Sequence, residues 1–216
     1  IRAKTMAALA AQAAQNAAMK GATEVEARGM AVREAFLASI GGLPRTSAPL
    51  NAKLIDAIAR DGYRIEKIVY ESQPLTYVTG LLYVPDEIQE KAPAVLFVCG
   101  HAREAKAYPE YQRVCHDLAI NGFVVFAIDP TGQGERVTSL DPETGDMKIP
   151  WGTVEHSYQG LACALTGTSI ARYFLWDAMR ALDLLEARQE VDSNRIGMTG
   201  NSGGGTQTTL MCMSGE

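Results

Sequence analysis

The sequence lacks the patterns that would place it in several common classes of protein. It contains no run of eighteen apolar residues, so we expect no membrane-spanning helix. It has no cluster of basic residues and carries a mild net charge of −5, which argues against a nucleic-acid partner. No C-x-x-C pair occurs among its cysteines, so we expect no zinc site; the cysteines are Cys99, Cys115, Cys163 and Cys212.

The glycine-rich stretch at residues 129–136 lacks the signatures of nucleotide binding. It contains neither G-K-[ST] nor G-x-G-x-x-G, so a phosphate cradle and a dinucleotide site are both disfavoured. We therefore expect no cofactor and interpret this stretch as a tight turn at the carboxyl end of a strand. Asp129 and Arg136 are expected to brace loops there through hydrogen bonds and an ion pair.

The length and composition of the chain fit one α/β domain with an added N-terminal segment. The 216 residues are 47% hydrophobic, which is enough to bury a core. Residues 1–44 are rich in alanine, the best helix former, so we expect one or two helices there. These would form a surface helix or a helical cover that ends at the glycines and proline of residues 41–44. Residues 45–216 would form the α/β domain.

Hydrophobic patterns along residues 45–216 predict alternating strands and helices. The expected strands are residues 63–72, 77–84, 93–98, 123–128 and 195–199, of which the first two form an antiparallel pair. The expected helices are residues 111–120 and 169–188, and a long loop covers about residues 130–165. This alternation predicts a mostly parallel sheet with helices on both faces.

The strongest sign of chemistry is a serine between the last expected strand and the helix that follows it. Residues 200–204, Gly-Asn-Ser-Gly-Gly, fit G-x-S-x-G, in which a strained turn lifts the Ser202 hydroxyl clear of the sheet. The amide of Gly203 then points at the oxygen that becomes an oxyanion when an acyl carbonyl is attacked. A glycine-rich helix start with an idle serine, or a phosphate-binding loop, is the alternative. The strand and helix on either side favour a nucleophile elbow.

Two histidines lie in loops that follow expected strands. The backbone amide of His101, or of Ala102, would supply the second oxyanion donor after the strand at residues 93–98. We interpret the His101 side chain as facing substrate or bracing a loop rather than as a catalytic base. Glu155 and His156 lie in the expected long loop, where a solvated or loop-bracing pair is the default interpretation. No further metal ligands stand near them.

These motifs resemble those of the α/β hydrolase superfamily, and within it the bacterial acetyl xylan esterase-like and dienelactone hydrolase-like enzymes. The resemblance covers about residues 40–216 and rests on residues 100–101, 129–136, 191–197 and 199–208. It implies an α/β-hydrolase fold, with residues 45–216 as its N-terminal part. It also implies Ser202 as the nucleophile and the amides of Gly203 and His101 as the oxyanion hole.

The expected activity is hydrolysis of a carboxylic ester through an acyl-enzyme on Ser202. A small ester or an acylated carbohydrate is the expected substrate, and removal of acetyl groups from a carbohydrate is the specific hypothesis. A serine peptidase of the prolyl oligopeptidase type shares the elbow and is one alternative. A non-catalytic binding module with a hydrolase fold is the other.

No histidine follows Ser202, although the acid and the histidine of a hydrolase triad come after the serine. His101, His116 and His156 all precede it, and the only later acid is Glu216. Either the chain stops before its acid and base, or it departs from the usual order. We favour the first, so we expect the rest of the domain beyond residue 216 and negligible turnover by this chain alone. The open sheet edge would then invite association, so an oligomer is also an expectation.

Overall fold

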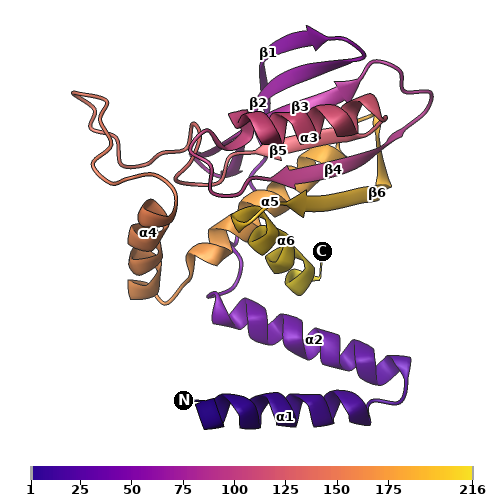
Figure 1. The fold of residues 1–216 in the computed structure, drawn as a ribbon, viewed down its shortest axis with the longest axis vertical. Helices are drawn as coiled ribbons and strands as arrows, with labels where there is room; N and C mark the ends of the chain where they lie inside the picture. The colour runs from indigo at the N-terminus through magenta and orange to yellow at the C-terminus, as the bar shows by residue number, and fades with distance from the viewer. Residues whose placement is uncertain (1, 216) are drawn as a thin grey trace.

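The computed structural model describes residues 2–215 as a sheet with helices on both faces and two helices ahead of it (Figure 1). Ile1 and Glu216, which end two of the ranges predicted above, lie outside the described residues. The strands are β1 (Lys53–Arg60), β2 (Tyr63–Gln73), β3 (Thr76–Pro85), β4 (Ala92–Val98), β5 (Val124–Ile128) and β6 (Val191–Gly200). The helices are α1 (Arg2–Ala18), α2 (Ala22–Ser39), the 3₁₀ helix η1 (Ala105–Ala107), α3 (Pro109–Ile120), α4 (Thr153–Leu165), α5 (Ile170–Glu186) and α6 (Gly203–Ser214).

Within residues 2–215 the strands follow the order β1-β2-β3-β5-β4-β6. Strand β4 pairs in parallel with both β5 and β6, as the alternation of strands and helices predicts. Strand β2 is antiparallel to β1 and β3, and β3 is antiparallel to β5. The antiparallel pair expected at residues 63–84 is therefore confirmed. The sheet is mixed rather than mostly parallel, because the hairpin strands join it as an antiparallel half.

Strand β1 is an element that the sequence patterns missed. Nearly all of its residues are exposed, including the adjacent apolar pair Leu54 and Ile55. It lies at one edge of the sheet, where β2 is its neighbour. An exposed strand shows no alternation of apolar and polar residues, so only its pairing with β2 reveals it.

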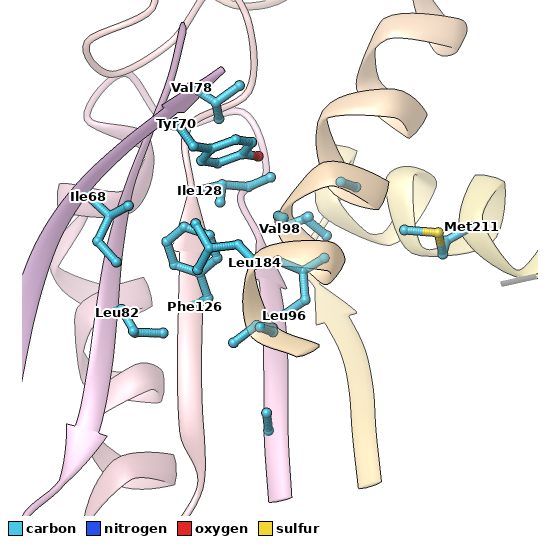
Figure 2. Close-up of a cluster of buried hydrophobic side chains, with 14 of the residues drawn as sticks. Ile68, Tyr70, Val78, Leu82, Leu96, Val98, Phe126, Ile128, Leu184 and Met211 are labelled. Carbon is cyan, nitrogen blue, oxygen red and sulfur yellow. The ribbon is translucent and has the colours of Figure 1, made fainter. Parts of the chain in front are cut away.

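Strand β5 divides the core into two layers, because successive side chains of a strand point to opposite faces. All five of its residues are buried, which confirms the continuous apolar run as a strand covered on both sides. Phe126 packs in the layer that includes Leu184 of α5 (Figure 2). Ala127 packs in the opposite layer with Cys115 of α3. The prediction of helices on both faces is thus confirmed.

The alanine-rich N-terminal region is helical and lies mostly on the surface, as predicted. Helix α1 has no buried residue, and α2 buries only Phe36 near its end. Ile40 follows as a second anchor, and its carbonyl accepts a hydrogen bond from the Ser169 amide at 3.2 Å. The end of α2 is therefore attached to the domain while α1 extends away from it (Figure 1). The domain boundary at residue 44 stays a prediction.

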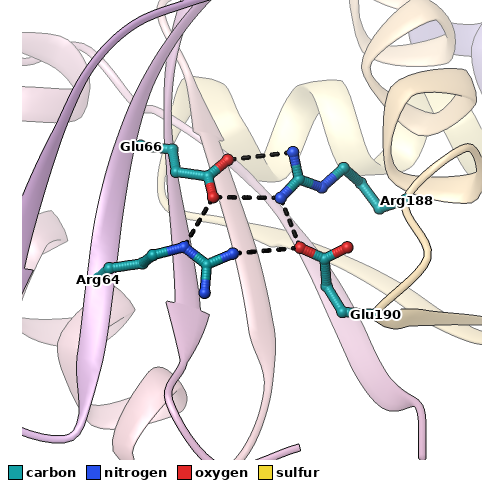
Figure 3. Close-up of polar contacts among 4 residues, drawn as sticks. All are labelled: Arg64, Glu66, Arg188 and Glu190. Carbon is teal, nitrogen blue, oxygen red and sulfur yellow. Dashed lines mark hydrogen bonds and ion pairs between the residues drawn. The ribbon is translucent and has the colours of Figure 1, made fainter.

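Two arginines and two glutamates join β2 to the turn between α5 and β6 (Figure 3). The Glu66 carboxylate accepts hydrogen bonds from Arg64 at 2.8 Å and from Arg188 at 3.2 Å. Arg188 also pairs with Glu190. The Glu66 side chain is 7% exposed, whereas Arg64 is 41% exposed. Removing one partner from an ion pair closed off from water costs more stability than removing one from an exposed pair.

We expect Glu66→Gln to lower the free energy of unfolding by about 1–2 kcal/mol, because Arg64 and Arg188 each lose one of their two charged partners and keep only Glu190. Urea denaturation followed by tryptophan fluorescence measures the change. Glu110→Gln is the matched control, since Glu110 and Arg113 form a pair that is 59% and 71% exposed. The Glu110→Gln variant is expected to lose less than about 0.5 kcal/mol of stability. Equal losses in the two variants would contradict the assignment.

Candidate active site

Ser202 occupies the turn between β6 and α6, where the sequence pattern indicates an elbow. Strand β6 ends at Gly200 and α6 begins at Gly203. Ser202 has φ 53° and ψ −113°, a conformation that residues other than glycine rarely adopt. The residue is also exposed, at the N-terminal end of a helix whose first amides have no partner within the helix. A strained, exposed serine at a strand-to-helix turn has the geometry of a nucleophile elbow.

The loop that follows β4 lies directly against this turn. A Cβ atom built on Gly204 would overlap the carbonyl oxygen of Val98. A Cβ atom built on Gly100 would overlap the carbonyl oxygen of Asn201. Neither position can carry a side chain unless the two backbones separate. Because β4 and β6 pair in parallel up to their carboxyl ends, the two loops that follow them meet at this edge.

The loops that carry the two predicted oxyanion donors, His101 and Gly203, meet at this contact. The His101 ring lies beside Gly203, where a built Cβ atom would be 2.6 Å from Cε1 and 2.8 Å from Nδ1 of the ring. Within residues 2–215, neither the His101 nor the Gly203 amide donates to another group. The amide of Ala102, the alternative donor, is 2.8 Å from the carbonyl oxygen of Gly100. The amides of His101 and Gly203 are therefore both free to donate, whereas the amide of Ala102 is not.

His101 and His156, which are far apart in the sequence, meet beside the elbow. Nε2 of His101 lies 3.3 Å from Nδ1 of His156. Nε2 of His156 lies 2.7 Å from the carbonyl oxygen of Thr131, and Phe174 packs edge-on against the His156 ring. Burial lowers the pKa of His156 below its ordinary value. His156 thus braces the Thr131 loop, while its contact with His101 was not predicted, because no local pattern links the two residues.

Glu155 and His156 lie on a helix and not in a long loop. Helix α4 occupies the last part of residues 130–165, so the loop prediction was wrong there. Glu155 is 1% exposed and accepts hydrogen bonds from the Thr138 amide at 2.8 Å and from Gln159 at 3.1 Å. This excludes a solvated pair and makes Glu155 a brace for the preceding loop. Glu155 in the first helical turn is the sequence signal that could have located the helix.

Asp129 and Arg136 brace loops, but they do not form an ion pair with each other. The fully buried Asp129 carboxylate pairs with Lys106 and accepts a hydrogen bond from the Thr79 hydroxyl at 2.7 Å. Arg136 donates to the backbone carbonyl of Asp129 at 3.0 Å and pairs with the Asp177 carboxylate at 2.8 Å. The predicted ion pair was wrong because η1 and α5 bring closer partners of opposite charge to both side chains.

A cavity of about 450 Å³ lies beside α4, next to the Thr131 loop that His156 braces. Five of its lining residues carry hydroxyl groups, namely Thr76, Thr131, Thr138, Thr166 and Tyr173. A larger groove of about 1040 Å³ follows β2 and β3, and its lining includes none of Ser202, His101 and Gly203. The lining of the smaller cavity includes none of these three residues either, but it contains Thr131, whose carbonyl oxygen bonds His156.

Two further observations on the described residues concern membrane-spanning helices and metal sites. Within residues 2–215 no helix is both long enough and apolar enough to cross a membrane. The same part of the chain holds no group of three His, Cys, Asp or Glu side chains that could bind a metal ion.

Comparisons with known proteins point to one family. The family model described as acetyl xylan esterase (AXE1) matches residues 50–214. Among curated proteins, "Putative hydrolase YtaP" of Bacillus subtilis (strain 168) is 23% identical over 183 residues, which cover 80% of this chain and 56% of that protein.

Solved structures share the α/β-hydrolase fold at low identity. A "putative acetyl xylan esterase" from Bacteroides fragilis NCTC 9343 has a TM-score of 0.74 and 20% identity, covering 89% of this chain and 51% of that one. An acetyl xylan esterase from Paenibacillus sp. R4 has a TM-score of 0.57 and 22% identity, covering 85% and 52%. The predicted fold is confirmed, and the chain spans about half the length of the relatives it matches.

Proposed function

The chain belongs to the acetyl xylan esterase (AXE1) family, and on this premise we propose that it is a serine esterase that forms an acyl-enzyme on Ser202. The observation that carries the proposal is the backbone of Ser202, held at φ 53° between β6 and α6 with the His101 loop packed against it. A conformation this rare for serine persists only where the surrounding structure enforces it.

The proposed reaction begins when Oγ of Ser202 attacks the carbonyl carbon of an ester and a general base takes the hydroxyl proton. The carbonyl oxygen becomes an oxyanion that accepts hydrogen bonds from the amides of His101 and Gly203. The alcohol then leaves with a proton, and water releases the acyl group from the serine. Two free amides support this role, that of Gly203 at the N-terminus of α6 and that of His101 in the loop after β4, because such donors need no rearrangement as the charge develops.

The base and the acid of the triad are assigned to no residue of this chain. In α/β hydrolases both follow the nucleophile, and residues 203–216 contain no histidine. The chain also spans only about half the length of its relatives. Loss of a base costs on the order of 10⁶ in serine hydrolases, so turnover by the 216 residues alone is expected to be negligible.

The substrate that we favour is an acetyl ester of a carbohydrate. Membership of the acetyl xylan esterase family supports the acetyl group. The cavity beside α4 supports the carbohydrate, because its hydroxyl groups match the many hydrogen bonds that a sugar offers. A peptidase is the less favoured enzyme, and comparing p-nitrophenyl acetate with a peptide anilide separates the two.

Covalent labelling tests the nucleophile. We expect a fluorophosphonate probe to modify Ser202 in the product of the complete reading frame, and Ser202→Ala to remove the label. Ser157→Ala is the matched control, since Ser157 is an exposed serine of α4 whose hydroxyl bonds the Thr153 carbonyl. Its label is expected to remain at the native level.

Two results would overturn the proposal. Label that persists in Ser202→Ala would mean that another residue is the nucleophile. A folded protein that takes no label and hydrolyses neither p-nitrophenyl acetate nor the anilide would instead be a binding module.

A further inference from the structure

Two of the three histidines of this chain touch each other at the elbow, and the proposed mechanism uses neither side chain. The rings of His101 and His156 lie with their centroids 5.2 Å apart and their planes inclined at 58°. His101 comes from the loop after β4, whereas His156 comes from α4. The third histidine, His116, lies in α3, where its ring is tilted against Tyr63.

Hydrogen-bond chemistry determines which ring nitrogens carry hydrogen. A carbonyl oxygen only accepts, so Nε2 of His156 must donate its hydrogen to Thr131. A neutral imidazole carries one N–H, so Nδ1 of His156 can only accept. Its partner at 3.3 Å, Nε2 of His101, must therefore be the donor. Neutral His101 then has no hydrogen left for its Nδ1.

This Nδ1 lies closer to the elbow than Nε2 does, and the ring atom nearest to Gly203 is Cε1, which lies between the two nitrogens. A Cβ atom built on Gly203 would be 2.8 Å from Nδ1 of His101 and 3.4 Å from its Nε2. We propose that His156 is a positioning residue, which holds His101 in the Nε2–H form so that its Nδ1 is a hydrogen-bond acceptor beside the elbow. Such an acceptor suits a hydroxyl group of the ester's alcohol portion. The role of Nδ1 as an acceptor for the substrate rests on the proposed function, whereas the assignment of the His101 tautomer does not.

Adding one proton to the two histidines turns Nδ1 of His101 from a hydrogen-bond acceptor into a donor. If His156 takes the proton, its Nδ1 must donate, and the hydrogen of His101 moves from Nε2 to Nδ1. If His101 takes it, both of its nitrogens carry hydrogen. The groups that face His156 are His101, the Glu155 carboxylate, the Thr131 carbonyl and the Phe174 ring. Burial of His156 outweighs the favourable charge of the Glu155 carboxylate and lowers the pKa of His156, which favours the neutral form of this ring.

Nitrogen-15 NMR of the imidazole rings tests the assignment without any turnover. With three histidines, the chain gives three sets of ring signals. At pH 8 we expect His101 and His156 of the native chain each to show a single Nε2–H tautomer. His156→Phe is expected to convert His101 into a mixture of tautomers, because an imidazole without a fixed partner samples both.

Two further variants separate positioning from general damage. His156→Gln is expected to restore the single tautomer, because its amide group can donate to Thr131 while its oxygen accepts from His101. His116→Gln is the matched control and is expected to leave the His101 signals unchanged. A native His101 that already shows both tautomers, or one that is unchanged in His156→Phe, would overturn the proposal. Neither result depends on whether Ser202 is a nucleophile.

Discussion

Replacing Gly204 with alanine is expected to lower the free energy of unfolding by about 3 kcal/mol. The new methyl group would overlap the carbonyl oxygen of Val98 and lie 3.0 Å from its carbonyl carbon. Both neighbours are backbone atoms of β4 in the middle of the sheet, so they cannot turn aside as a flexible side chain would. The start of α6 must instead move away from the sheet and take Ser202 with it. Urea denaturation measures the loss.

Gly205→Ala is the matched control for this prediction. Gly205 is the next residue of the same helix, and a Cβ atom there would lie 3.5 Å from the carbonyl oxygen of Gly200, an ordinary van der Waals contact. Alanine favours a helix over glycine by about 0.5–1 kcal/mol, so this variant is expected to be slightly more stable than the native chain. Two variants of equal stability would show that α6 does not press against β4.

Replacing Lys106 with methionine is expected to cost about 3–5 kcal/mol, because it leaves a buried carboxylate without its counter-charge. Lys106 is 6% exposed, and its partner Asp129 is 0% exposed. Asp129 keeps its hydrogen bonds from the Thr79 hydroxyl at 2.7 Å and the Lys106 amide at 3.1 Å. Those bonds do not replace a full positive charge inside the protein. Chemical denaturation measures the effect.

The other partner of Lys106 supplies the control. Glu135 lies 2.6 Å from the ammonium group but is 69% exposed, so Glu135→Gln is expected to cost less than about 1 kcal/mol. Adding Asp129→Asn to Lys106→Met is expected to recover part of the loss, since the isolated charge is then gone. If Lys106→Met loses no more stability than Glu135→Gln, or if the double variant regains none, the Lys106–Asp129 pair does not support the loop that follows β5.

The sequence predicted a helix or strand correctly wherever the residues of that element alone form a recognisable pattern. The apolar runs of β4 and β5 and the helical spacing of α5 were predicted within a few residues of their observed bounds. The turn at Ser202 was predicted as well, because glycines and a strand-to-helix change lie within ten residues. Strand β1 was missed because it is exposed and its neighbour alone makes it a strand. Helix α4 was missed because it follows a long irregular segment, and Glu155 in its first turn was interpreted as part of that segment.

By itself, the sequence determined the succession of strands and helices and the position of a serine between a strand and a helix. These features depend on backbone preferences and on spacing within a few residues. Only the tertiary structure decided which side chains meet. Lys106 pairs with Asp129 across 23 residues, and His101 contacts His156 across 55. Such contacts follow from the order and register of strands in the sheet, which juxtapose loops that no local pattern connects.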